Sequence, residues 1–279
     1  MIPYHRPRSL EAALALRPGA VPLAGGTDIY PARTARAGWG DPTHPPVLDL
    51  SALPGLRGVT EIATGWRIGA LTTWTDILRA DLPPLFDGLR AAAREVGGVQ
   101  VQNRGTIVGN LCTASPAGDG IPNLLALDAS VEIAGPMGSR TIPVSDFVTG
   151  YRATALGPQE IVLALHVPRL DGAQSSFRKL GARRYLVISI AMAAGVVALD
   201  EEARIATARI ALGACSPVAL RLSALESALV GVRAADAAEI PQDTHLDTLS
   251  PLDDIRASAA YRRGAALTLL RDLLAGIVR

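Results

Sequence analysis

The stretch QNRGTIVGNLCTASPAGDG, residues 102–120, carries most of the information about how this chain folds and what it binds. It contains four glycines and almost no charge, and small hydroxyl and amide side chains lie between the glycines. A plain surface loop of this composition would not usually follow a long helix and then become apolar again at Ile121. The stretch predicts a loop that wraps a polar ligand, and its residues do not suit a metal.

A second glycine turn lies nearer the N-terminus, in the stretch PLAGGTDI, residues 22–29. It follows a predicted strand and precedes a predicted helix over residues 30–38. Glycine lets the backbone approach a ligand closely, and consecutive amides can then point outward to bind an anion such as phosphate. An ordinary strand-to-helix turn is the alternative interpretation. The stretch lacks the G-x-G-x-x-G pattern and no Walker lysine follows it, which excludes the Rossmann and P-loop assignments.

The side chains of the 102–120 stretch suit a ligand rich in hydroxyls. Thr106, Thr113 and Ser115 can bond ribityl hydroxyls or phosphate oxygens, Asn110 can donate and accept, and Asp119 can accept from a sugar hydroxyl. A loop that satisfies its own polar groups through Asx and Ser/Thr turns would show the same residues. Two such turns in one domain favour an extended ligand that carries phosphate.

Composition restricts the class of protein. The chain has 279 residues, of which 49% are hydrophobic and 19% charged, with a formal net charge of +1. This length and composition predict two modest folded domains. No basic stripe with interleaved aromatics occurs, so we expect no nucleic-acid partner. The first residues do not form a secretory signal and no apolar run would span a bilayer, so we expect a soluble, cytoplasmic protein.

The two cysteines, Cys112 and Cys215, belong to no CxxC motif or Cys/His cluster. We therefore expect no iron–sulfur or zinc site in this chain. Cys112 has no histidine near it in sequence and is better interpreted as a small apolar residue than as a nucleophile. His166 lies in an apolar stretch and is expected to be a core residue.

The pattern of strands and helices predicts an α+β fold with a boundary near residue 170. Residues 1–55 alternate short strands and helices, as in a small parallel unit, and 56–170 form a larger α+β unit. Residues 171–279 predict a three-stranded antiparallel sheet and helices. One of these helices is expected to begin with Ser216 as its cap and Pro217 in its first turn. A long terminal helix is expected from Asp254 onward.

Four stretches carry a resemblance to a known family: PLAGGTDI, QNRGTIVGNLCTASPAGDGIPNLLAL, EIVLALHVP and FRKLGARR. Their order and spacing are similar to those in the FAD-binding subunit of the molybdenum hydroxylases. This family includes the medium subunit of carbon monoxide dehydrogenase and the flavin domain of xanthine dehydrogenase. The resemblance covers nearly the whole chain, and it implies the FAD-binding fold shared with vanillyl-alcohol oxidase and p-cresol methylhydroxylase.

The resemblance also implies which residues contact FAD. The matching positions are Leu23, Ala24, Gly25, Gly26, Thr27, Asp28 and Ile29 in the first turn, Thr106, Ile107, Val108, Gly109 and Asn110 in the second, and Val96, Thr113, Ser115, Asp119, Val162, Lys179 and Tyr185 elsewhere. The chain departs from the family at one point, because relatives often have two glycines where it has Val108-Gly109. A branched side chain restricts φ and would narrow the approach of the cofactor at that turn.

In function, the resemblance implies an electron-transfer subunit with no catalytic acid or base of its own. Electrons would pass from a molybdopterin large subunit through the [2Fe–2S] clusters of a small subunit to FAD, and then to NAD, a quinone or oxygen. A dimer of such heterotrimers is one arrangement that the family suggests. Two alternatives stay open. The chain could be a stand-alone flavin oxidoreductase of the same fold. It could also be a scaffold subunit that has lost its flavin, and Val108 is the only residue that points to this second alternative.

Overall fold

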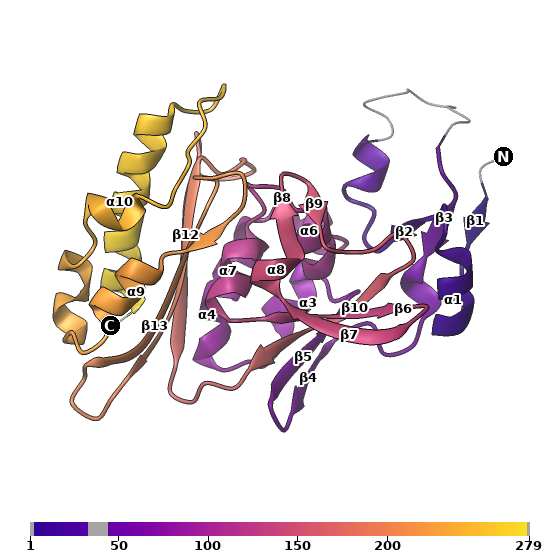
Figure 1. Ribbon diagram of the computed structural model, residues 1–279, viewed down its shortest axis with the longest axis horizontal. Helices are drawn as coiled ribbons and strands as arrows, with labels where there is room; N and C mark the ends of the chain where they lie inside the picture. The colour runs from indigo at the N-terminus through magenta and orange to yellow at the C-terminus, as the bar shows by residue number, and fades with distance from the viewer. Residues whose placement is uncertain (1–2, 33–43, 278–279) are drawn as a thin grey trace.

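Three larger sheets follow one another along the described part of the chain, with a two-stranded sheet beside the second, and helices cover and connect them (Figure 1). The computed structural model describes residues 3–32 and 44–277. The N-terminal unit lies at one end of the molecule and the C-terminal sheet with its helices at the other, with the five-stranded sheet between them.

The N-terminal sheet is parallel, in the order β1-β3-β2, as the alternation of short strands and helices predicts. Ser9 caps its first helix by accepting a hydrogen bond from the amide of Ala12 at 3.2 Å. Residues 29–32 are helical, whereas most of the helix expected over 30–38 lies outside the described residues. The elements are β1 (Tyr4–His5), α1 (Leu10–Leu16), β2 (Val21–Leu23) and β3 (Val47–Asp49).

The second sheet is antiparallel, in the order β4-β5-β10-β6-β7, and a two-stranded sheet of β8 and β9 lies beside it. The helix after β5 begins at Thr73, whose side chain forms a reciprocal capping box with Asp76. The strands are β4 (Val59–Ile62), β5 (Gly65–Gly69), β6 (Ser130–Gly135), β7 (Gly138–Pro143), β8 (Val148–Gly150), β9 (Ala153–Thr154) and β10 (Ile161–Pro168). The helices are α3 (Trp74–Arg79), α4 (Asp87–Glu95), α5 (Val99–Gln102), α6 (Ile107–Thr113), α7 (Gly120–Ala126) and α8 (Val144–Phe147).

The C-terminal sheet contains the three expected antiparallel strands and a short fourth one at its edge, in the order β11-β12-β13-β14. The elements are β11 (Gln174–Leu180), β12 (Ala191–Leu199), β13 (Ile205–Gly213), β14 (Leu220–Arg221), α9 (Ser223–Leu229) and α10 (Ala259–Ile277). The helices α9 and α10, which follow the sheet in the chain, pack on one side of it.

The predicted start of the helix at Ser216 is wrong. Residues Leu220–Arg221 pair with β13 instead, and α9 begins only at Ser223. Ser216 does not cap a helix: its hydroxyl donates to the carbonyl of Cys215 and accepts from the amide of Ser250. The terminal helix likewise begins at Ala259 rather than at Asp254. Pairing with an open sheet edge outweighs the local helical pattern in the first case.

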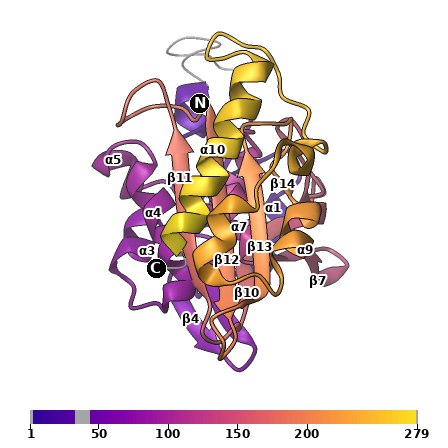
Figure 2. The same cartoon turned by 90° about the vertical axis from the view of Figure 1, so that its left-hand side faces the viewer.

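The C-terminal sheet is covered on both faces. On one face α10 lies over β11 and β12 (Figure 2), and on the other α4 and α7 pack against the same sheet. All seven residues of α7 are buried. The largest core joins side chains from the second unit, such as Trp74 and Phe86, with Met192 and Val196 of β12. This shared core makes the contact between the second unit and the C-terminal sheet a buried apolar one.

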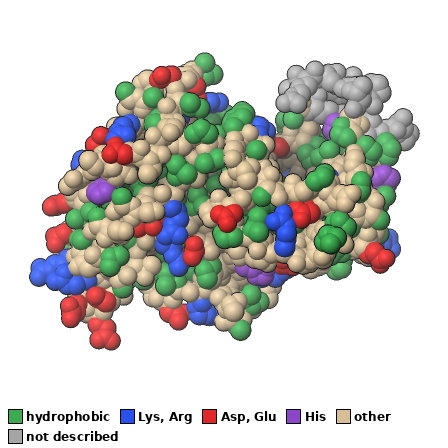
Figure 3. Space-filling model, viewed as in Figure 1, with side chains coloured by type: hydrophobic (Ala, Val, Ile, Leu, Met, Phe, Trp, Pro, Cys, Tyr) green, Lys and Arg blue, Asp and Glu red, His purple; other side chains and the backbone are tan. Residues whose placement is uncertain are grey.

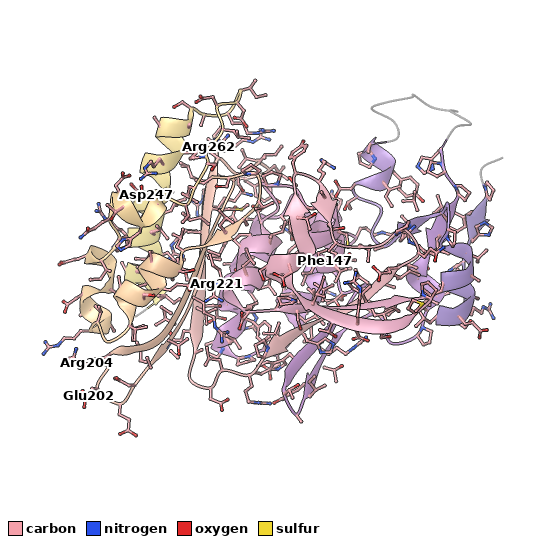
Figure 4. All side chains as sticks on the ribbon, viewed as in Figure 1. Phe147, Glu202, Arg204, Arg221, Asp247 and Arg262 are labelled. Carbon is pink, nitrogen blue, oxygen red and sulfur yellow. The ribbon has the colours of Figure 1, made fainter. Side chains whose placement is uncertain are left out.

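Two buried or half-buried arginines tie the C-terminal helices to their surroundings (Figure 4). Arg262, near the start of α10, donates to the carbonyls of Ile190 and Ala214 and pairs with Asp254. Arg221 on β14 makes a two-bond ion pair with Glu226 of α9, at 2.8 Å for each bond. These contacts hold α9 and α10 against the sheet that they cover.

On the face seen in Figure 3, basic and acidic side chains of the described residues are interspersed. Within residues 3–32 and 44–277, none of the helices is both long enough and apolar enough to cross a membrane.

Candidate functional site

The first glycine turn leaves the end of β2 and leads into the helix that begins at residue 29. Gly26 has a φ of +77°, which favours glycine. Gly25 is confined by packing, because a Cβ atom there would lie 1.9 Å from the carbonyl oxygen of Arg104. The backbone of this turn therefore lies directly against the chain that leads into α6.

The amides of this turn are available to a ligand. Within the described part of the chain, the backbone N–H groups of Gly26, Thr27 and Asp28 donate to no protein acceptor. Three successive free amides at a positive-φ turn are the arrangement that binds an anionic oxygen. Such amides suit an anionic group such as a phosphate.

The second segment differs from the expected turn. Residues 107–113 form a helix, α6, rather than part of a loop. Thr106 caps it, and its side chain accepts from the amide of Gly109 at 2.9 Å. Val108 has helical neighbours and a side chain that is only 5% exposed within the largest core. Its branched side chain is compatible with a helix, and the narrowing of the cofactor's approach at this position stays a prediction.

Both segments line one cleft with two lobes. The first lobe has a volume of about 340 Å³ and the second about 160 Å³. The residues that line both lobes are Pro22, Ala24, Gly109 and Cys112, so the lobes are adjacent at the start of α6. These four residues form a wall that the two lobes share.

The first lobe brings together many of the residues that the sequence predicts at a cofactor site. These are Ala24, Gly25, Gly26, Thr27, Asp28, Ile29, Val96, Thr106, Gly109, Asn110 and Thr113. The second lobe adds Val108 and Val162. Leu23 and Ile107 are buried behind the two turns rather than in the lining, while Ser115 accepts from the amide of Ala117 within its own loop.

Direct hydrogen bonds connect the two segments and fix their shape. Thr113 Oγ1 lies 3.2 Å from Asp28 Oδ2 and 2.9 Å from the carbonyl oxygen of Gly109, and its single proton can be donated to either acceptor. Asn110 Oδ1 accepts from the amide of Gly120 at 3.1 Å, which holds the start of α7 beside α6. The walls of the first lobe are thus connected independently of any ligand.

Asp119 and Lys179 lie outside the cleft lining, in an ion pair between the second unit and the C-terminal sheet. Lys179 Nζ lies 2.6 Å from Asp119 Oδ2, and both side chains are nearly fully buried. Ser189 Oγ donates to Asp119 Oδ1 at 2.6 Å. Burial raises the pKa of the Asp119 carboxyl above its usual range, while Lys179 and Ser189 act in the opposite direction. Contact of Asp119 or Lys179 with a cofactor stays a prediction.

Tyr185 lies on the exposed loop between β11 and β12 and also outside the lining of both lobes. Its hydroxyl approaches the chain at Gly98, since a Cβ atom there would lie 3.8 Å from Tyr185 Oη. Gly98 is close in sequence to Val96, which lines the first lobe. The loop is therefore near the cleft at its Val96 end.

Several lining residues were not predicted from the sequence. Trp74, Val101 and Gly105 line the first lobe, and Cys112 lies in the wall of both lobes. Burial raises the pKa of the Cys112 thiol to about 12, so this cysteine is an apolar wall residue and not an activated nucleophile. Apolar and small side chains carry no motif, and only the fold could reveal their place in the cleft.

Groups of three or more histidine, cysteine or acidic side chains that could hold a metal ion are absent from residues 3–32 and 44–277. The polar groups that line the two lobes are backbone amides, threonine hydroxyls, the side-chain amide of Asn110, the carboxylate of Asp28 and the guanidinium of Arg17. They match the phosphate and hydroxyl chemistry of a dinucleotide.

Comparison with protein families gives two matches that together cover most of the chain. Residues 1–170 match the FAD binding domain in molybdopterin dehydrogenase, and residues 176–277 match the CO dehydrogenase flavoprotein C-terminal domain. These matches agree with the resemblance carried by the sequence motifs and with the α+β fold that it implies.

Known proteins of similar sequence are also similar in length. The chain is 30% identical to the carbon monoxide dehydrogenase medium chain of Hydrogenophaga pseudoflava, over 97% of this chain and 95% of that one. It is 31% identical to the glyceraldehyde dehydrogenase medium chain of Sulfolobus acidocaldarius, over 93% and 92% of the two chains. Among solved structures, the reconstituted CO dehydrogenase from Oligotropha carboxidovorans contains a chain with a TM-score of 0.88 and 27% identity, covering 100% of this chain and 98% of that chain.

Proposed function

The chain belongs to the FAD-binding family of the molybdopterin dehydrogenases, and on that premise we propose that FAD lies along its two-lobed cleft. The chain is an oxidoreductase subunit whose cofactor is FAD. The proposal concerns where the cofactor lies and what the chain does with it. We place the diphosphate at the turn of Gly26, Thr27 and Asp28, with one end of the dinucleotide in each lobe.

One observation carries this placement: the close backbone contact between Gly25 and Arg104 brings the free amides of the first turn beside α6. The diphosphate carries the charge that three free amides can bind, and the hydroxyls of Thr106 and Thr113 and the amide of Asn110 suit a ribityl chain. The family pattern alone supports four further contacts with FAD, by Ser115, Asp119, Lys179 and Tyr185.

In this proposal the bound FAD supplies the redox chemistry and the chain holds, orients and shields it. The chain would receive electrons from the [2Fe–2S] clusters of a small partner subunit, which in turn takes them from a molybdopterin large subunit. An external acceptor such as NAD, a quinone or oxygen would then oxidise the flavin. The name "medium chain" given to several relatives supports a complex with other subunits. We place this complex in the cytoplasm.

FAD binding by the purified full-length chain tests the placement. After incubation with FAD and removal of the unbound flavin, we expect the chain to keep a flavin absorbance spectrum. FMN should bind at least about a hundredfold more weakly, because FMN lacks the adenosine half that would occupy the other lobe. Equal affinity for the two flavins would contradict a two-lobed site. A chain that is colourless after the unbound FAD has been removed would instead support the flavin-free scaffold.

The subunit role needs a separate experiment on the complex. We expect the chain to co-purify with a molybdopterin protein and a double-cluster iron–sulfur protein when the neighbouring genes are expressed with it. The flavin should then be reduced by the substrate of the molybdenum subunit. Reduction by an organic substrate in the isolated chain would favour the stand-alone oxidoreductase.

A further inference from the structure

One buried carboxylate holds both ends of the loop that connects β11 to β12. Lys179 is close to the C-terminal end of β11, and Ser189 is two residues before β12 begins. Lys179 Nζ and Ser189 Oγ each donate to a different oxygen of Asp119, both at 2.6 Å. Asp119 is 5% exposed and Ser189 only 1%. The second unit therefore holds the two ends of this loop through Asp119.

The loop of residues 181–188 is folded on itself. The guanidinium of Arg183 donates to the carbonyl of Leu186, and Leu186 has a φ of +52°. Gly181 packs against Val187, since a Cβ atom at Gly181 would lie 2.4 Å from a methyl carbon of Val187. The loop is consequently a compact unit.

The tip of the loop rests beside the cleft. A Cβ atom at Gly98 would lie 3.4 Å from Leu186 Cδ2 and 3.8 Å from Tyr185 Oη. Gly98 directly precedes α5, and Val96 and Val101 on either side of it line the first lobe. The position of the loop therefore affects how open the first lobe is at its Val96 end.

We propose that Ser189 is a positioning residue that holds the 181–188 loop against Gly98 through its hydrogen bond to Asp119. The ion pair with Lys179 acts at the β11 end of the loop. At the β12 end, the amide of Ile190 donates to the carbonyl of Leu180 and Arg262 donates to the carbonyl of Ile190, so the Ser189 hydroxyl is the side-chain contact that holds the segment just before Ile190. A hydrogen bond to a buried carboxylate is among the stronger ones in a protein, so its loss loosens this segment without removing the ion pair. The consequence for cofactor access rests on the function proposed above.

Trypsin reports on this loop directly, because it contains the exposed pair Arg183 and Arg184. In the full-length chain we expect Ser189→Ala to raise the rate of cleavage after these arginines about tenfold, as for the loss of a hydrogen bond to a charged group. Ser189→Thr keeps the hydroxyl and should stay within about twofold of the parent rate. The matched control Ser145→Ala removes an exposed hydroxyl far from the loop in sequence and should leave the rate of cleavage after Arg183 and Arg184 unchanged.

Cleavage at the parent rate in Ser189→Ala would overturn the proposal, and so would an equal rise at all exposed arginines, which indicates general unfolding. If Ser189→Ala does not fold, Ser189→Cys gives a side chain of similar size and a weaker donor, and a smaller rise confined to the loop is expected. With FAD bound, Ser189→Ala should also increase quenching of flavin fluorescence by iodide. A chain that binds no FAD would contradict the proposed function alone, since the cleavage measurements would still decide the role of Ser189.

Discussion

Gly25 and Arg104 are in backbone contact: a Cβ atom built on Gly25 would lie 1.9 Å from the Arg104 carbonyl oxygen. The contact joins the turn after β2 to the segment before α6, and it sets the distance between the two walls of the cleft. Neither residue can move away without opening the site, because Gly105 lies against the same glycine.

Gly25→Ala should damage the site through this contact. The added methyl group meets backbone atoms that have no rotamer to adopt, and such overpacking costs about 1–3 kcal/mol of unfolding free energy. We expect FAD affinity to fall at least about fivefold, the factor that corresponds to the lower end of this cost if it is borne by the bound state. Chemical denaturation and fluorescence titration with FAD measure the two effects.

The matched control for this change is Gly264→Ala. Gly264 lies in the interior of α10, and a Cβ atom there would meet nothing within 4 Å. We expect this variant to gain about 0.5–1 kcal/mol of stability with unchanged FAD binding, because alanine loses less entropy than glycine in a helix. A Gly25→Ala variant that behaved like Gly264→Ala would show that the two turns are not in tight contact.

Thr113→Val removes the hydroxyl that lies between Asp28 and Gly109. We expect about a threefold to tenfold loss in FAD affinity, the range for one ordinary hydrogen bond. Thr268→Val on α10 is the control, because Thr268 makes the same bond to the carbonyl four residues before it and is remote from the cleft. Equal FAD affinity in both variants would mean that the contact between Thr113 and Asp28 does not shape the site.

The two thiols should react slowly in the folded chain. Burial raises the pKa of Cys112 to about 12 and that of Cys215 to about 11. At pH 8 the thiolate is then scarce, and alkylation of Cys112 should be roughly a thousandfold slower than that of a free cysteine. Bound FAD should lower the alkylation rate of Cys112 further and leave that of Cys215 unchanged, because of the two cysteines only Cys112 lines the cleft. Mass spectrometry of each alkylated peptide measures both rates, and rapid labelling of Cys112 with FAD bound would contradict the placement of the cofactor.

Acid should destabilise the start of α10 through Asp254. The backbone amide of Arg256, the guanidinium of Arg262 and the backbone amide of Ala257 each donate a hydrogen bond to this carboxyl and lower its pKa to about 2. A carboxyl with a lowered pKa stabilises the folded state at pH values above its ordinary pKa near 4. This contribution is lost as the pH falls towards 2. We expect Asp254→Asn to be less stable than the parent chain at pH 7, with the difference shrinking between pH 4 and pH 2. Melting temperatures across this range measure it, and a constant difference would exclude the carboxylate as the cause.

Local sequence was sufficient to predict structure where that structure depends on contacts between residues close in the chain. The capping box at Thr73 and Asp76, the cap at Ser9 and the turn at Gly26 all depend on neighbours within a few residues. Their signals are therefore visible in the sequence. The family resemblance extended this to the FAD-binding fold of the whole chain, which the domain matches confirm.

Local sequence failed where a distant partner decides the conformation. The residues before Ser223 carry a helical pattern, yet Leu220–Arg221 complete the edge of a sheet. Thr106 to Asn110 read as a glycine turn, yet they begin a helix whose Val108 points into the core. In both cases burial against a remote element outweighs the local preference.

The sequence by itself determined the glycine turn after β2 and the family to which the chain belongs, because both depend on residue types in a linear order. Only the tertiary structure decided that Gly25 lies against Arg104 and that Asp119 pairs with Lys179 and Ser189. A carboxylate buried away from water requires a cation or donors beside it, and which distant side chains supply them follows from the packing of the C-terminal sheet on α7.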